Sequence, residues 1–154
     1  MWVDADANQL QQALINLAMN SCEALRVRSP GTFADVVNFE GGGEALLLDR
    51  HNAGSALLMF RLDRENLSTP RAAFPQAVPP GDYAVITVAD QGCGMTSDEL
   101  SRCVEEFFTT KEEGRGTGLG LPTVKEIVEG HHGFLTLQSK SGVGTIAQIY
   151  LPRL

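Results

Sequence analysis

The segment from residue 83 to residue 95 constrains the fold more than any other part of the sequence. Tyr83 to Ala89 is β-branched and apolar and follows a Pro-Gly-Asp turn, which predicts a buried strand. This strand runs directly into Asp90-Gln91-Gly92-Cys93-Gly94-Met95. A carboxylate at this position can accept a hydrogen bond from an amino group, and the two glycines allow a flat ligand to approach the backbone. The segment therefore predicts the edge of a binding site as well as a strand.

A helix is predicted near the N-terminus. Asp6 is a good N-cap, because its side chain can accept hydrogen bonds from the first backbone N–H groups of a helix. Apolar residues then recur at spacings of three and four, which predicts one face of a helix of about 18 residues that ends near residues 26–30. These residues are Leu10, Ala13, Leu14, Leu17, Ala18, Cys22 and Leu25. Asn16, Asn20 and Glu23 share a polar face of the same helix.

The rest of the chain mixes predicted strands with predicted helices. Strands are expected at Thr32–Phe39, Ala45–Leu48 and Ala56–Leu62, and a proline-rich irregular loop at Asn66–Pro80. Helices are expected at Ser97–Glu105 and Gly118–Gly130, and an antiparallel hairpin at Phe134–Ser139 and Thr145–Leu151. This order predicts an α+β fold, a two-layer α/β sandwich whose mixed, mostly antiparallel sheet packs against about three helices.

Composition sets limits on size and on partners. A chain of 154 residues is long enough for one domain with a core and too short for two ordinary ones, so residues 1–154 are expected to form a single domain. The net charge of −7 argues against binding to nucleic acid or to an anionic membrane. No apolar stretch approaches the ~20 residues of a transmembrane helix, and no signal peptide is visible. Three cysteines without a C-x-x-C pair favour a reduced, cytosolic setting without zinc.

Two further glycine-rich segments stand at the ends of predicted elements. Gly114–Leu121 leads into a helix, and backbone N–H groups at a helix N-terminus bind phosphate well. Gly142-x-Gly144-Thr145 forms a tight turn before the last strand. Asn20 offers a neutral oxygen to a hard cation such as Mg²⁺, which commonly shares its ligands with phosphates. The glycine spacings match neither a Walker-type loop nor G-x-G-x-x-G, so phosphate binding would need another scaffold.

Five of these segments resemble, in order, the sequence boxes of sensor histidine kinases. Residues 16–20 resemble the asparagine box, 90–95 the first glycine box, 107–111 the phenylalanine box, 116–121 the second glycine box and 142–145 the final glycine box. The resemblance is to the catalytic, ATP-binding domain, and it implies the Bergerat fold of the GHKL-type ATPase and kinase superfamily. The middle segment, residues 31–80, is longer than is usual in that family.

The resemblance implies a role for each matched residue. Asp90 would bind the adenine amino group of ATP, Thr145 would support the base, and Asn20 would hold Mg²⁺ with Asn16 close by. Further ATP-binding residues would be Gly92, Gly94 and Met95 at the pocket edge and Gly116, Thr117, Gly118, Leu119, Gly120 and Leu121 at the phosphates. Residues 107–117 would form a lid that includes Phe107, Phe108, Thr109, Thr110, Lys111 and Arg115. Phe107 and Phe108 would anchor the lid, Lys111 or Arg115 would neutralise the γ-phosphate, and Asn16, Asn20 and Lys111 would be catalytic.

Three features depart from the pattern of the family. Asn16 stands where the hydrolysing relatives carry a glutamate that activates water, and an amide cannot take a proton at neutral pH. Glu23 stands where many histidine kinases carry a basic residue, so it would contact Mg²⁺ through water or hold a nearby Lys or Arg. His51, His131 and His132 all lack the following acidic residue of a phospho-accepting helix. The acceptor histidine is therefore expected on another part of a longer kinase.

The sequence thus predicts the catalytic domain of a two-component sensor histidine kinase. We expect it to bind Mg²⁺-ATP and to donate the γ-phosphate to a histidine on the dimerisation and phosphoacceptor domain of the same kinase. A response-regulator receiver domain would be the downstream partner. The isolated domain is expected to be monomeric and cytoplasmic, as a free protein or as the cytoplasmic part of a membrane-bound sensor. Two alternatives stay open: an ATPase in which ATP drives dimer closure, and a non-catalytic nucleotide-binding module.

Overall fold

The computed structural model describes residues 2–27, 58–111 and 116–154. In chain order its elements are α1 (Ala7–Val27), β1 (Leu58–Leu67), β2 (Phe74–Pro75), β3 (Gly81–Asp90), α2 (Ser97–Arg102), α3 (Gly120–Gly130), β4 (Phe134–Lys140) and β5 (Gly144–Pro152). The predicted strands Thr32–Phe39 and Ala45–Leu48 lie outside the described residues.

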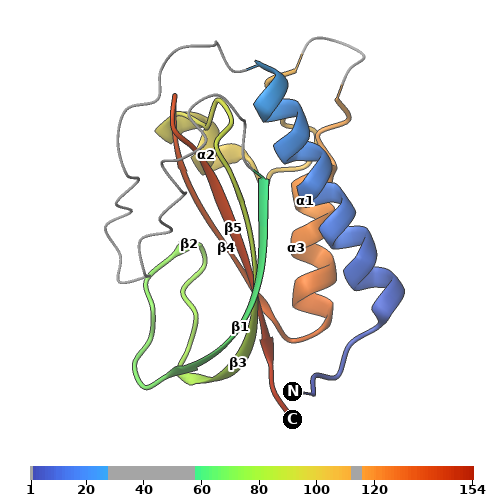
Figure 1. Cartoon of the computed structure of the whole chain (residues 1–154), viewed down its shortest axis with the longest axis vertical. Helices are drawn as coiled ribbons and strands as arrows, with labels where there is room; N and C mark the ends of the chain where they lie inside the picture. The colour runs from blue at the N-terminus through green and yellow to red at the C-terminus, as the bar shows by residue number, and fades with distance from the viewer. Residues whose placement is uncertain (1, 28–57, 112–115) are drawn as a thin grey trace.

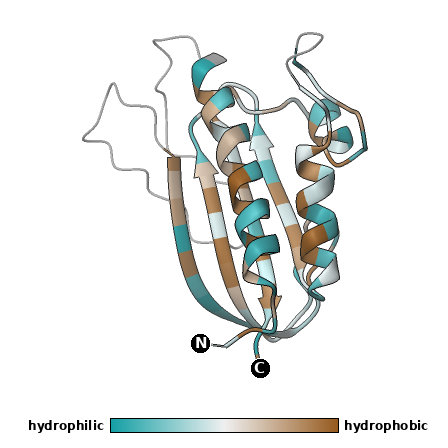
Figure 2. Ribbon diagram, turned by 90° about the vertical axis from the view of Figure 1, so that its right-hand side faces the viewer, coloured by the Kyte–Doolittle hydropathy of each residue, from teal (hydrophilic) through white to brown (hydrophobic). Residues whose placement is uncertain are grey.

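The five strands form one sheet in the order β1-β3-β5-β4-β2. α1 and α3 lie side by side against one face of this sheet, and Figure 2 shows both helices in front of the strands (Figure 1, Figure 2). The predicted two-layer α+β sandwich is therefore confirmed. The expectation of a mixed sheet is wrong for the described strands, because every pairing among them is antiparallel.

The main core fills the space between the two long helices and the sheet. Its fully buried members come from both layers: Ala13, Val124 and Val128 from the helices, and Leu135 and Ile149 from the sheet. Apolar side chains at spacings of three and four give each helix one buried face, and alternate residues of β4 and β5 face that layer. Packing of this kind holds α1 and α3 side by side on the sheet, where they run in opposite directions.

The lower ends of the two helices are tied together by a capping arrangement. The Asp6 carboxylate accepts hydrogen bonds from the backbone N–H groups of Asn8 and Gln9, at 2.8 and 3.1 Å, which confirms the predicted N-cap. The backbone N–H of Asp6 donates to Nε2 of His131, at 2.9 Å, just beyond the end of α3. This contact helps to hold the start of α1 against the end of α3. As a result, the end of α1 and the start of α3 also lie together, at the other end of the sheet.

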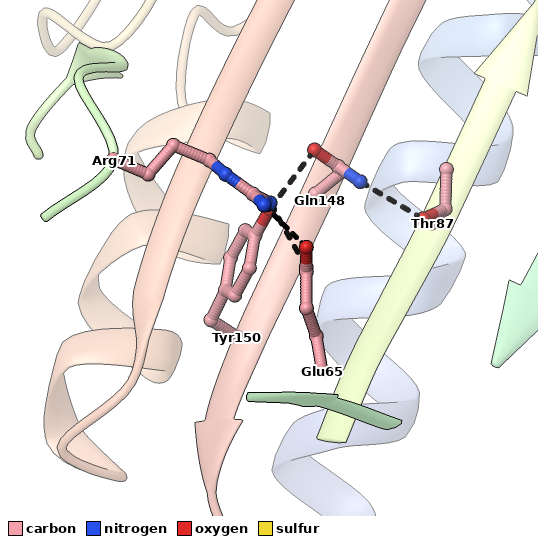
Figure 3. Close-up of polar contacts among 5 residues, drawn as sticks. All are labelled: Glu65, Arg71, Thr87, Gln148 and Tyr150. Carbon is pink, nitrogen blue, oxygen red and sulfur yellow. Dashed lines mark hydrogen bonds and ion pairs between the residues drawn. The ribbon is translucent and has the colours of Figure 1, made fainter. Parts of the chain in front are cut away.

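A polar network covers part of the other face of the sheet (Figure 3). The Arg71 guanidinium forms an ion pair with Glu65 and donates to the Tyr150 hydroxyl at 2.7 Å. The Tyr150 hydroxyl donates to Gln148 at 3.2 Å, and the Gln148 amide donates to Thr87 at 3.3 Å. Since Tyr150 is fully buried, the network supplies hydrogen bonds that a buried hydroxyl requires, and it fastens the segment after β1 to the sheet.

Segment 66–80 differs from its prediction as an irregular loop. Leu67 completes β1, Phe74 and Pro75 form β2 beside β4, and Arg71 bridges to Val78. Proline is tolerated here because β2 is an edge strand, where one side needs no partner for a backbone N–H. β1 also continues to Leu67, beyond the predicted end of the strand at Leu62. The prediction ended early because the additional positions include charged residues.

The two later helices are shorter than predicted. α2 ends at Arg102 instead of Glu105, and α3 begins at Gly120 instead of Gly118. The difference at α3 arises because Gly118 has a φ of +68°, which lies outside the helical region. The hairpin of β4 and β5 is confirmed, with Lys140 paired to Gly144 across the turn.

Replacing Ile149 with alanine is predicted to destabilise the fold by about 2–5 kcal/mol, because a fully buried side chain between sheet and helices leaves a cavity. Chemical denaturation followed by circular dichroism measures this loss. Leu62→Ala is the control, since the Leu62 side chain is 62% exposed on edge strand β1 and its loss should cost no more than about 0.5 kcal/mol. Equal effects of the two substitutions would contradict the assignment of the core.

Candidate functional site

Four predicted site segments meet at one end of the sheet, the upper end in Figure 1. β3 ends at Asp90, which pairs with Thr145 at the start of β5. The second half of α1 reaches the same end, where its Asn20 lies beside Gly120 at the start of α3. The antiparallel register and the alignment of α1 with α3 thus gather residues that are far apart in the sequence.

Asp90 is the buried polar centre of this end. Its side chain is only 7% exposed. One carboxylate oxygen accepts a hydrogen bond from the Ser21 hydroxyl at 2.8 Å, and the other accepts from the Gly92 backbone N–H at 2.9 Å. The backbone of Thr145 also hydrogen-bonds to the carboxyl group. The site therefore holds a carboxylate in place as a hydrogen-bond acceptor.

Burial has a measurable consequence for this acid. Removal from water raises the pKa of the Asp90 carboxyl group above its ordinary value of 3.8. The hydrogen bonds from Ser21, Gly92 and Thr145 stabilise the charged form and oppose that shift, but burial is the larger effect. A raised pKa at a buried group with several fixed donors is typical of a functional site.

The first glycine segment, residues 90–95, is clamped between α1 and the β4–β5 turn. The Cys93 N–H donates to the carbonyl of Ala24 on α1, and the Gly142 N–H donates to the carbonyl of Cys93, at 3.1 and 2.7 Å. Gly92 lies so close to α1 that an added Cβ would come within 2.6 Å of the Ala24 side chain. Gly94 has a φ of +63° and faces the Lys140 carbonyl, with which a side chain would collide. Both glycines are therefore required by the close approach of the backbone.

The turn between β4 and β5 is joined to the same segment by hydroxyl groups. The Ser139 hydroxyl accepts a hydrogen bond from the Met95 N–H at 2.8 Å and lies 2.8 Å from the Thr145 hydroxyl. Gly144 packs directly on the Asp90 carbonyl, where any side chain would collide. Thr145 is half-buried at this point and pairs with Asp90 across the sheet.

The second glycine segment, residues 116–121, places Gly120 next to Asn20. An added Cβ on Gly120 would lie 3.5 Å from the Asn20 amide nitrogen and 3.6 Å from its oxygen. The N-cap residue of α3 is Leu119, whose apolar side chain makes no capping hydrogen bond. The first N–H groups of α3 therefore face the Asn20 side of the site without a side-chain cap, which suits an anion.

The described part of the lid folds back on α1. Lys111 forms an ion pair with Glu23, which confirms that Glu23 holds a nearby Lys or Arg. The Lys111 N–H donates to the Thr109 hydroxyl at 3.1 Å, and Gly116 lies against both side chains. Arg115 lies outside the described residues.

The expectation that both phenylalanines anchor the lid is wrong for Phe107. Its side chain is 71% exposed and its φ is +66°, so it is held by its backbone N–H, which donates to the Gly118 carbonyl at 3.0 Å. Phe108 is partly buried and its ring stacks under the Arg102 guanidinium, at 4.4 Å. Phe108 alone therefore packs its ring against the body through a described contact.

A magnesium ion would have to rely on Asn20 and on its ligand's own oxygens. Within residues 2–27, 58–111 and 116–154, no group of three or more His, Cys, Asp or Glu side chains is placed to hold a metal ion. A neutral amide oxygen beside an uncapped helix N-terminus fits a metal that arrives with phosphate oxygens and water. The residues present therefore fit magnesium bound together with a phosphate ligand.

Two residues of this site were missed by the sequence analysis. Ser21 is 5% exposed and bonds to Asp90, whereas Cys22, which was placed on the apolar face of α1, is exposed. Ser139 was placed only in a strand. The signal for Ser21 was its position four residues after Leu17, because that spacing returns to the buried face of a helix.

The other predicted site residues divide into two groups. Asn16, Asn20, Met95, Gly118, Gly120 and Leu121 are partly buried around the end of α1 and the start of α3, whereas Thr110, Thr117 and Leu119 are exposed. Asn16 accepts a hydrogen bond from Gln12 on its own helix at 2.9 Å. The structure thus brings the asparagine and glycine segments together around Asp90, with the lid at their edge.

A fixed acceptor carboxylate, a glycine-rich helix start without a side-chain cap and a neighbouring asparagine amide together suit a ligand that carries an amino group and phosphates. Comparison with known proteins agrees. Residues 5–154 match the sequence profile of the family described as histidine kinase-, DNA gyrase B-, and HSP90-like ATPase. The chain belongs to this family, and within it to the catalytic domains of sensor histidine kinases.

Relatives include a sensor kinase, CckA, of Brucella abortus, which is 36% identical over 100% of this chain and 14% of its own length. Sporulation kinase C of Bacillus subtilis is 30% identical over 97% of this chain and 25% of its own length. The chain therefore spans a quarter or less of these two relatives.

Solved structures share the fold. The mycobacterial sensor histidine kinase MprB superposes with a TM-score of 0.60 at 22% identity, covering 97% of this chain and 76% of that one. Full-length ShkA in complex with AMPPNP superposes with a TM-score of 0.58 at 21% identity, covering 97% of this chain and 22% of that one. The helices of the described ranges are too short or too polar to cross a membrane.

Replacing Asp90 with asparagine is predicted to weaken ATP binding while leaving the stability of the fold nearly unchanged. The amide presents a donor to the adenine amino group, so ATP affinity measured by calorimetry should fall at least about tenfold. The free energy of unfolding at pH 7 should change by less than about 1 kcal/mol, because the substitution also removes a buried charge.

The raised pKa of Asp90 predicts how its contribution to the free energy of unfolding changes with pH. Because the Asp90 pKa is higher in the folded chain than in the unfolded chain, the folded chain binds more protons at this residue. Its contribution to stability therefore falls as the pH rises from the ordinary aspartate pKa through the raised one. Denaturation curves should show this slope in the wild type and not in Asp90→Asn; identical slopes would contradict the raised pKa.

Proposed function

We propose that this chain binds Mg²⁺-ATP and donates the γ-phosphate to a histidine on a separate dimerisation and phosphoacceptor domain, as the catalytic part of a two-component sensor histidine kinase. The observation that carries the proposal is the juxtaposition of Asn20 with the uncapped start of α3, at the same end of the sheet as Asp90. Asp90 suits a base that carries an amino group, and Asn20 with the start of α3 suits phosphates.

Each part of the site would perform a distinct task. The Asp90 carboxylate would accept a hydrogen bond from the adenine amino group, with Thr145 beside it. The backbone N–H groups of residues 116–121 would bind the phosphates, because they lead into α3, whose N-cap residue Leu119 makes no side-chain capping hydrogen bond. Holding base and phosphates at fixed points orients the γ-phosphoryl group for transfer, which supplies most of the catalysis in reactions of this class.

Asn20 is the residue that would hold magnesium. The ion, when bound with ATP, supplies neutralisation of the negative charge on the phosphates. Asn20 would orient its amide oxygen toward them from α1, across from Gly120. Lys111 would add a positive charge if it exchanged its Glu23 partner for a phosphate, a step that the exposed position of Lys111 permits.

The proposed acceptor is a histidine rather than water. Asn16 occupies the face of α1 next to Asn20, where a general base for water would have to stand, and an amide cannot accept a proton at neutral pH. A phosphoacceptor domain of the same kinase would therefore supply the nucleophile, and a response-regulator receiver domain would receive the phosphate next. We place this activity in the cytoplasm and expect the isolated chain to be monomeric.

The direct test is phosphotransfer from ATP labelled at the γ-phosphate. Mixed with a separately supplied phosphoacceptor domain, the chain should place acid-labile label on the histidine of that domain, and Asp90→Asn should reduce the initial rate at low ATP. Release of free phosphate at a rate above that of the labelling would instead support the dimer-closing ATPase. If the chain binds nucleotide but places no label on the phosphoacceptor domain of its own kinase, the result would support a non-catalytic module.

Asn20→Ala is predicted to remove the magnesium dependence of ATP binding. In calorimetry, the wild type should bind ATP at least about tenfold more tightly with Mg²⁺ than with excess chelator, whereas the variant should show little difference. Asn8→Ala is a matched control, because Asn8 is an exposed asparagine at the far end of α1. An unchanged magnesium effect in Asn20→Ala would contradict the metal role.

A further inference from the structure

A buried serine on α1 contacts the carboxylate on which the proposed base recognition depends. Ser21 follows the magnesium-site residue Asn20 in sequence, but its side chain turns toward the sheet and is 5% exposed. Its hydroxyl donates to the Asp90 carboxylate at 2.8 Å, a contact that joins residues 69 positions apart. Neither the sequence boxes nor the proposed function assigns a role to this hydroxyl.

The hydrogen-bonding directions around Asp90 are set by its partners. The Gly92 N–H can only donate, so one carboxylate oxygen must accept from it. The Ser21 hydroxyl has one proton and directs it to the other oxygen. The Thr145 backbone supplies a third hydrogen bond. Together these donors fix the carboxylate in rotation and favour its charged form against the effect of burial, and one of its four lone pairs remains for a ligand.

We propose that Ser21 is a positioning residue that selects the base, because its hydroxyl holds Asp90 as an oriented acceptor for the 6-amino group of a purine. This proposal rests on the nucleotide-binding function proposed above. A 6-aminopurine brings an N–H donor to the free lone pair, whereas a 6-oxopurine brings a carbonyl oxygen that the carboxylate repels. Ser21 thereby acts through Asp90 rather than by touching the nucleotide.

Among the hydrogen-bond donors to Asp90, Ser21 is the one that a substitution can remove, because its donor is a side-chain hydroxyl. The neighbours of Asp90 from the other elements are Ala24 against Gly92 on α1, Leu58 on β1 and Thr145 on β5, and none of these is titratable. The titratable group that faces it from the adjoining loop is the Cys93 thiol, whose pKa is raised by burial, so it stays neutral at pH 7. Within residues 2–27, 58–111 and 116–154, three hydrogen bonds reach the Asp90 carboxyl group, of which two come from backbone groups and the Ser21 bond comes from a side chain.

The test compares the affinities of ATP and inosine triphosphate, which differ at position 6 of the purine. Ser21→Ala should weaken ATP binding about tenfold and lower the ATP-to-inosine-triphosphate affinity ratio by a similar factor, because it removes one hydrogen bond to a charged group. Ser21→Thr, which keeps the hydroxyl, should restore the ratio. Ser21→Cys serves as a second variant of similar size with a weak donor, and Ser68→Ala is the control at an exposed serine beyond the far end of β1.

A pH series separates positioning from packing. Loss of the Ser21 bond removes an interaction that lowers the pKa of the Asp90 carboxyl group, so the acid limb of ATP binding should move to higher pH in Ser21→Ala. Expressing each affinity relative to the wild type at the same pH cancels the titration of the nucleotide phosphates. Denaturation curves confirm that each variant is folded.

The outcomes are distinct. An ATP-to-inosine-triphosphate ratio and an acid limb that both match the wild type in Ser21→Ala and Ser21→Cys would overturn the role of Ser21. Equal weakening of both nucleotides with an unmoved acid limb would show a packing role and would also overturn it. If the wild type binds neither nucleotide, the proposed function itself fails, and this result is distinguishable because it appears before any variant is compared.

Discussion

The carboxylate of Asp90 is the point on which the arrangement of this domain depends. It joins the end of β3 to α1 through Ser21, to its own loop through Gly92 and to β5 through Thr145. Placing a carboxylate in a buried position is unfavourable unless hydrogen bonds compensate it, and here the donors come from three separate segments. The glycines at positions 92 and 144 are needed because the backbone around this carboxylate leaves no room for side chains. A buried acid that costs stability and is nevertheless surrounded by donors is best explained by a ligand that needs it.

The rest of the site follows from how α1 and α3 lie on the sheet. The contact between Asp6 and His131 ties their lower ends, and their buried faces set the spacing, so Asn20 meets Gly120 at the upper ends. The net charge of −7 would repel an anionic ligand at long range. Binding of phosphates must then come from local backbone N–H groups, from a metal and from a few cations such as Lys111. That lysine is paired with Glu23, which keeps it near the site.

Much of this architecture is predictable from local patterns, and the exceptions have physical causes. The strand into Asp90, the Asp6 cap and the final hairpin carry strong local signals of apolar runs, capping and turn residues. Ser21 was missed because polar residues in a helix are assigned to its exposed face, and only the tertiary contact with Asp90 reveals the burial. The β2 strand was missed because its pairing with β4 depends on a distant segment and its sequence contains proline. Phe107 was expected to anchor the lid because of the family resemblance, but its backbone has a positive φ and its side chain is exposed.

The central claim is that nucleotide binds at the end of the sheet where Asp90, Asn20 and the start of α3 meet. Titration of the isotope-labelled chain with AMPPNP and Mg²⁺, followed through the backbone amide resonances, tests it most directly. We expect the largest shifts on Gly92, Gly94, Gly118 and Gly120, which belong to the two glycine segments at that end. Shifts centred instead on Arg71 and Tyr150, on the opposite face of the sheet, or no shifts at all, would contradict it.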